Sequence, residues 1–74
     1  MDKEKEQRIK GKLNYFLESG LKVHVKRIDK QYWRGYVIGK ASDDIYNFAD
    51  DKLGNMLLFV LDVYDVVEFK EVSK

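Results

Sequence analysis

The chain has 74 residues, no cysteine and one histidine, which excludes disulfide bridges and makes a His/Cys metal cluster implausible. Hydrophobic residues make up 45% of the chain, and charged residues of both signs make up 36%. This composition is typical of a folded domain and not of a disordered chain. We therefore expect one small domain that holds no metal or other cofactor.

The N-terminus and the longest apolar run both bear on where the protein acts. Acidic and basic residues alternate from Asp2 to Glu6, whereas a secretory signal would need an apolar core there. The apolar run from Met56 to Leu61 has about a third of the length that a membrane span requires. These features predict a soluble cytoplasmic protein without membrane contact.

Charge is divided unevenly along the chain. Residues 1–40 hold 11 Lys/Arg against 5 Asp/Glu, a balance of +6, and residues 41–74 hold 3 against 8, a balance of −5. The two balances sum to the formal net charge of +1. Two interpretations stay open: the halves attract each other across the fold, or the basic segment at residues 22–40 binds phosphates.

Residues 2–19 are predicted to form an α-helix. Four large apolar residues have the i, i+4, i+7, i+8 spacing of one helical stripe: Ile9, Leu13, Phe16 and Leu17. Gly20 stands where a left-handed C-terminal cap belongs. Because an apolar stripe must be covered, we expect the helix to pack on the sheet that follows.

Residues 21–27 and 32–40 are predicted to form a β-hairpin around a turn at Asp29 and Lys30. The side chains expected to face inward are Val23, Val25, Trp33, Gly35 and Val37. The other face collects cations and aromatic rings, with His24 expected in solvent: Lys22, His24, Lys26, Tyr32, Arg34 and Tyr36. Gly35 and Gly39 inside the second strand predict a sharp bend or a bulge.

Three further strands are predicted, at residues 45–49, 56–61 and 66–71. Polar clusters at residues 42–44 and 50–55 mark the turns before the first two of these strands, and we interpret their paired aspartates as turn formers and not as a metal site. Residues 62–65 interrupt the chain before the last strand. Since residues 56–61 are all apolar, that strand is predicted to be central or covered on both faces.

One helix followed by five short strands and tight turns predicts a mainly β fold, in which an N-terminal α-helix precedes a five-stranded, strongly bent antiparallel barrel. A single domain then spans residues 1–74, with the helix at about 2–19 and the barrel at about 21–71. The helix is expected to cover one open end of the barrel.

The hairpin resembles the first motif of the Sm-like family, small SH3-like barrels that include the Sm proteins and the bacterial host factor for small RNAs. The matching positions are Val23, Val25, Asp29 with Lys30, Trp33, Gly35 and Val37. The second motif of that family, an aliphatic stretch ending in Arg-Gly or in a run like Tyr-Lys-His, is not matched between Leu58 and Val67. Arg27 also stands where the family usually has an apolar residue.

The resemblance extends to the RNA-contact signature of the family, an Asp followed four residues later by an Asn, which Asp43 and Asn47 match in spacing. In the family the Asn reads a base edge, the Asp braces the loop, and a side chain between them stacks on the base. The resemblance thus implies that Ile45 stacks on a base, with Tyr46 as its aromatic neighbour.

Catalysis is not predicted, because no nucleophile has a base at a recognisable spacing and no glycine-rich phosphate loop occurs. The first functional hypothesis is an Sm-like protein that binds single-stranded RNA as a homo-oligomeric ring. Its candidate contacts are Asp43, Ile45, Tyr46, Asn47, Lys22, Lys26, Arg34 and Tyr36. The second hypothesis is a small SH3-like barrel that serves as a protein-interaction or accessory scaffold module without RNA binding.

Overall fold

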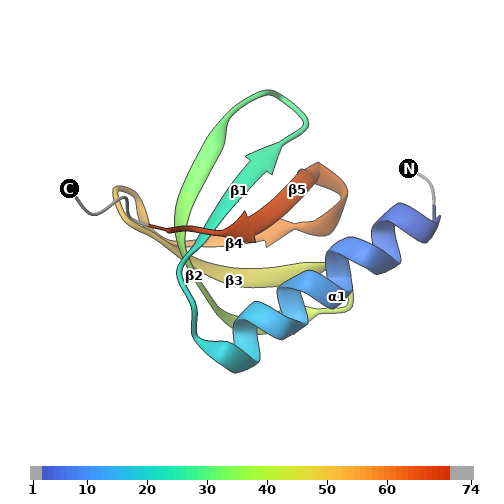
Figure 1. The fold of residues 1–74 in the computed structure, drawn as a ribbon, viewed down its shortest axis with the longest axis horizontal. Coiled ribbons are helices and arrows are strands. Elements are labelled where there is room, and N and C mark those ends of the chain that lie inside the picture. The colour runs from blue at the N-terminus through green and yellow to red at the C-terminus, as the bar shows by residue number, and fades with distance from the viewer. Residues whose placement is uncertain (1–2, 71–74) are drawn as a thin grey trace.

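A computed structural model describes residues 3–70, in which helix α1 precedes five strands joined by short turns (Figure 1). The elements are α1 Lys3–Ser19, β1 Val23–Arg27, β2 Tyr32–Ser42, β3 Ile45–Asp50, β4 Gly54–Phe59, the 3-10 helix η1 Val60–Asp62, and β5 Val63–Glu68. The prediction of a mainly β fold with an N-terminal helix is confirmed. The predicted ends at residues 2 and 71 lie outside the described part of the chain.

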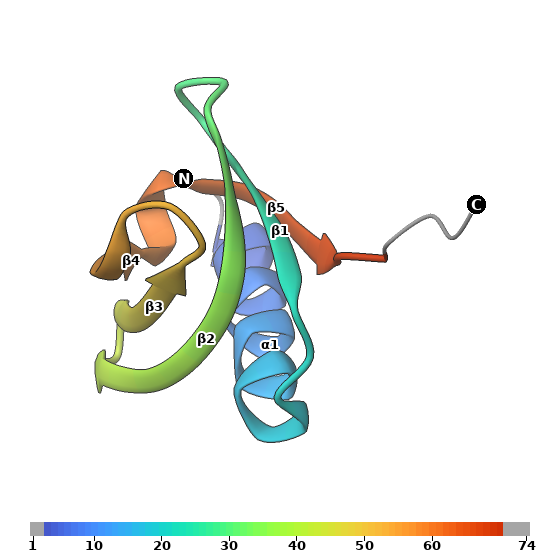
Figure 2. The ribbon, with the colours of Figure 1, turned by 90° about the vertical axis from the view of Figure 1, so that its left-hand side faces the viewer.

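The strands form one antiparallel sheet in the order β4-β3-β2-β1-β5. The sheet is strongly bent, as Figure 2 shows along the curved path of β2. β4 and β5 are its two edges and do not pair with each other. The fold is therefore like a small barrel that stays open between these two strands.

Helix α1 packs on the sheet through the predicted stripe. Ile9 and Leu13 are fully buried and Phe16 nearly so, and the helix contacts β2, β5 and η1. Gly20 adopts a left-handed conformation with φ of 69°, and its N–H donates to the carbonyl of Phe16 at 3.0 Å. This is the predicted cap, which fits glycine because a Cβ is disfavoured at positive φ.

The bend of β2 has a local cause. A Cβ on Gly35 would overlap the carbonyl oxygen of Ala49 on β3, so only glycine lets the two strands approach this closely. The β2–β3 register shifts between Val37 and Gly39 and again between Lys40 and Ser42. The predicted bulge in this strand is thus confirmed, and each extra residue adds to the local bend.

The core lies between α1 and the concave side of the sheet. Its buried side chains are Ile9, Leu13, Phe16, Val23, Val25, Val37, Tyr46, Phe48, Leu58, Val60, Val63 and Val66. Trp33 faces inward as predicted but is only partly buried, with the Arg27 guanidinium 4.3 Å from its ring centroid. Asp50 is a turn former as interpreted, because its carboxylate accepts the N–H groups of Lys52 and Leu53, both at 2.8 Å.

Three sequence-based expectations are wrong. β4 is an edge strand and not a central or doubly covered one, with Leu58 buried but Leu57 and Phe59 exposed. The last strand begins at Val63 and not at residue 66, because only the short η1 separates it from β4. His24 is half-buried instead of solvated, and no hydrogen bond to its Nε2 atom is found within residues 3–70.

Candidate nucleic-acid interface

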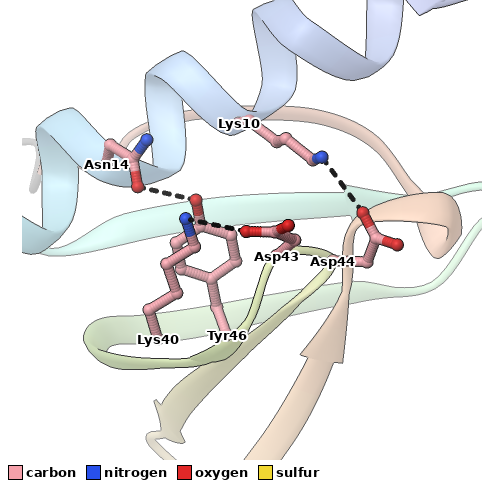
Figure 3. A network of polar contacts seen from close by, with 6 residues as sticks. All are labelled: Lys10, Asn14, Lys40, Asp43, Asp44 and Tyr46. Atoms are coloured by element: carbon pink, nitrogen blue, oxygen red, sulfur yellow. Dashed lines mark hydrogen bonds and ion pairs between the residues drawn. The ribbon is translucent and has the colours of Figure 1, made fainter.

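The β2–β3 turn, where the RNA-contact signature begins, is fastened to helix α1 (Figure 3). Asp44 forms an ion pair with Lys10 at 3.0 Å, and its backbone carbonyl accepts the N–H of Val60 at 2.9 Å. The hydrogen bond to Asp44 raises the pKa of Lys10 above its usual value. Asp43 is 94% exposed and lies 3.8 Å from Lys40. The turn therefore has a structural role in holding the helix to the sheet.

Tyr46 is buried beneath the same helix. Its hydroxyl donates a hydrogen bond to the Asn14 side-chain oxygen at 2.6 Å (Figure 3), and its side chain is fully enclosed in the core. Burial raises the pKa of Tyr46 above 10.0, Lys10 acts against this rise, and Asp43 adds to it. The Tyr46 ring, expected as the aromatic neighbour of a stacking Ile45, is a core group and is not accessible to a base in this fold.

Ile45 and Asn47 lie on the opposite, outer face of β3. Their cross-strand partners are Phe59 and Leu57 of β4, and both side chains are half-buried. A hollow of about 300 Å³ opens beside Asn47, and its walls are formed by Ile38, Asn47, Asn55, Met56 and Leu57. None of these lining residues is charged, so this surface suits an apolar partner better than a phosphate backbone.

One end of the basic hairpin is partly neutralised. The Lys22 ammonium group pairs with Asp51 at 2.6 Å and lies 5.0 Å from the Phe69 ring centroid. The Arg34 guanidinium lies 5.6 Å from the same ring, and Tyr36 is exposed beside them on the outer face of β2. A phosphate would have to compete with Asp51 for Lys22, which weakens the predicted contribution of that lysine.

The other end of the hairpin carries Lys26 among aromatic rings. Its ammonium group lies 5.1 Å from the ring centroid of Tyr64 and 6.0 Å from that of Tyr32. The His24 ring meets Tyr32 edge to face at 5.0 Å. The Lys5 ammonium group reaches the Tyr64 ring from α1 at 4.2 Å. Cations and exposed tyrosines from four separate elements, α1, β1, β2 and β5, therefore meet at this end.

The predicted contact residues are spread over three places and do not form one site. Asp43 and Tyr46 belong to the contact between the turn and α1, and Ile45 and Asn47 to the outer face of β3 and β4. The four hairpin residues lie elsewhere, with Lys26 on β1, Arg34 and Tyr36 on β2, and Lys22 directly before β1. Tyr64 was missed because it falls in the predicted interruption at residues 62–65, where no alternation assigns it to a face.

Two further kinds of feature bear on function, a metal-binding cluster and a membrane-spanning helix. Within residues 3–70, no three His, Cys, Asp or Glu side chains gather closely enough to hold a metal ion. No helix in the same range is long and apolar enough to cross a membrane.

Comparisons with protein-family models, curated proteins and solved structures find no match for this chain. The fold defines its class as a small, open antiparallel barrel preceded by a helix. Its free sheet edges and exposed side chains are therefore the features from which a function can be inferred.

Proposed function

We propose that this protein is a non-catalytic, Sm-like module that assembles into a homo-oligomeric ring and binds single-stranded RNA. The observation that carries the proposal is the free edge of β4. This strand contains no charged residue, and its Leu57 and Phe59 side chains are exposed. Edge strands that are not protected by charge, proline or a covering element readily pair with another strand.

The second free edge supplies the partner for this contact. β5 pairs with β1 on one side only, so β4 of one copy can pair with β5 of the next. Such a head-to-tail contact closes into a ring when the rotation between copies permits. Each Leu or Phe that becomes fully buried contributes roughly 1.5–3 kcal/mol, which supplements the small core of a chain of this length.

RNA binding is supported by the composition of the outer hairpin face. Lys26 lies there over the Tyr32 ring and Arg34 over the Phe69 ring, and the Tyr32 and Tyr36 side chains are exposed. Proteins that bind single strands combine cations along the backbone with aromatic rings on which bases stack.

Two measurements on the intact chain test the proposal. Light scattering after gel filtration should give a mass several times the 8.8 kDa of one chain, whereas a stable monomer would contradict ring assembly. Fluorescence anisotropy with short uridine-rich and adenine-rich RNA should show binding that weakens as salt is added, because phosphate contacts release counterions. Absence of binding at low salt would contradict the RNA function.

A second candidate is a protein-interaction or accessory scaffold module. The ion pairs Lys10–Asp44 and Lys22–Asp51 favour it, because they occupy cations that RNA would otherwise use. In this case the β4 edge would accept an extended segment of a different protein, as sheet edges do in strand addition. The expected outcome is then a monomer that binds no oligonucleotide at any salt concentration.

A further inference from the structure

We propose that the base-stacking site for single-stranded RNA is the exposed pair Tyr32 and Tyr64, with Lys26 and Lys5 holding the flanking phosphates. This inference rests on the proposed RNA binding. It moves the site away from the β2–β3 turn, which the Sm-like resemblance implied, to the outer face of β1, β2 and β5.

The sheet brings the two tyrosines to the same lysine. In the strand register, Lys26 on β1 lies opposite Tyr32 on β2 and opposite Asp65 on β5. Its ammonium group lies 6.0 Å from the Tyr32 ring centroid and 5.1 Å from that of Tyr64. Tyr32 is 57% exposed and Tyr64 is 51% exposed. The backbones of both tyrosines are therefore held in strands, while their rings remain open to a ligand.

The surface around the tyrosines is hollowed on two sides. One hollow of about 300 Å³ and another of about 230 Å³ share Lys26, Tyr32 and Tyr64 in their walls. Lys30 lines the first hollow and His24 the second. These volumes lie at or below the lower end of those found for small-molecule pockets, which suits single nucleobases.

The nearby carboxylates already have protein partners. Asp65 accepts a hydrogen bond from Lys12 at 2.8 Å and one from the backbone N–H of Val66 at 2.9 Å. Burial acts against ionisation of Asp65, but these hydrogen bonds outweigh it and lower its pKa. Asp62 lies 3.7 Å from the Arg27 guanidinium. Lys5 and Lys26, by contrast, point their ammonium groups over aromatic rings.

An RNA strand can displace these lysines from the rings. A cation over an exposed ring is held more weakly than a stacked base, so a base gains by taking the place of the ammonium group. The lysine chain is long and flexible, and its released charge can then reach the phosphate beside that base. The same four side chains thereby supply both the stacking surface and the charge that a single strand requires.

The decisive variants remove the rings one at a time. Anisotropy with fluorescein-labelled oligouridine and oligoadenylate should show that Tyr32→Ala and Tyr64→Ala each weaken binding by about 5- to 150-fold, the value of one lost stack. Tyr64→Phe keeps the stacking ring and should bind as the unchanged chain does. The matched control is Tyr15→Ala on α1, which removes a ring that is 59% exposed outside this surface and should leave affinity unchanged.

Two lysine variants test the proposed contact with phosphate. Lys26→Ala should weaken binding to all sequences alike and reduce the slope of log affinity against log salt by roughly 0.7, the value for one phosphate contact on a single strand. Lys52→Ala in the β3–β4 turn removes an exposed lysine elsewhere and should leave the slope unchanged. Circular dichroism spectra of all variants should match that of the unchanged chain.

The outcomes separate this inference from the function on which it rests. If the unchanged chain binds RNA but both tyrosine variants bind equally well, the site is overturned while the RNA function stands. If the unchanged chain binds an acidic peptide and no RNA, the RNA function fails and the site fails with it. Loss of RNA affinity in Tyr32→Ala and in Tyr64→Ala, with Tyr15→Ala unaffected, supports both the RNA function and the stacking site.

Discussion

Two glycines show how differently the same residue type is used in this chain. Gly35 lies where β2 meets β3, and a Cβ there would overlap the carbonyl oxygen of Ala49. Gly11 lies in the middle of α1 with open space around it. The first glycine is required by packing, whereas the second only adds flexibility to the helix.

Alanine at these two positions should therefore have opposite effects on stability. Gly35→Ala forces the backbones of β2 and β3 apart and should lower the free energy of unfolding by about 1–3 kcal/mol or more. Gly11→Ala should raise it by up to about 1 kcal/mol, the difference in helix propensity. Urea unfolding at one fixed protein concentration measures both, and equal effects at the two sites would contradict the packing explanation.

Tyr46 offers a second test at this scale. Tyr46→Phe removes the hydrogen bond to Asn14 and should cost about 0.5–1.5 kcal/mol at neutral pH. The pKa of Tyr46 is raised in the fold, so its stabilising contribution is complete below pH 10 and is lost as the pH rises through the folded-state value. The deficit of Tyr46→Phe should thus shrink above pH 10.

Urea unfolding of the variant and of the unchanged chain at neutral and alkaline pH measures this difference. Tyr15→Phe is the control, because the Tyr15 side chain is exposed on α1 and the change should matter little at either pH. If the difference in free energy of unfolding between Tyr46→Phe and the unchanged chain stays constant across the alkaline range, the phenol of Tyr46 does not titrate as its burial requires.

Among the elements, β4 has the greatest consequence for assembly. If its edge joins two copies, then Leu57→Lys should abolish or weaken the association, because a lysine on an edge strand opposes the addition of another strand. Light scattering should show a fall in mass towards that of one chain. Leu53→Lys, in the turn before β4 and also exposed, is the control and should keep the mass of the unchanged chain.

The elements differ in how well the sequence predicts them. Helix α1 and the β1–β2 hairpin follow from periodic patterns, since a stripe or an alternation marks which side chains are buried. β4 has no such period, because its exposed Leu57 and Phe59 are as apolar as its buried Leu58. The apolar run therefore indicated burial on both faces, and the edge position became visible only from the strand order.

The candidate site was harder to predict than the fold. Tyr46 and Phe48 alternate with Ile45 and Asn47, so two aromatic rings share one face of β3. This alternation predicts that Tyr46 is buried, whereas the spacing of the RNA-contact motif predicts that it lies at the RNA surface, and the structure follows the alternation. Tyr64 could not be found at all, since its meeting with Lys26 depends on the β1–β5 pairing.

At the scale of the whole described chain, part of the uneven charge joins the two halves of the sequence. Ion pairs connect Lys10 with Asp44, Lys12 with Asp65, Lys22 with Asp51 and Arg27 with Asp62. These ion pairs support the interpretation that the oppositely charged halves attract each other. Ion pairs near the surface stabilise a fold only weakly, because solvent screens them, so the helix is held mainly by its buried apolar stripe.

The single tryptophan has a practical consequence. Trp33 lies next to Tyr32 on β2, between the Arg27 guanidinium and the Phe48 ring, and it is only half enclosed. Its fluorescence emission therefore comes from one known position at the edge of the core. Unfolding separates the ring from Phe48 and should change its intensity or wavelength, which gives the protein an intrinsic optical reporter of unfolding.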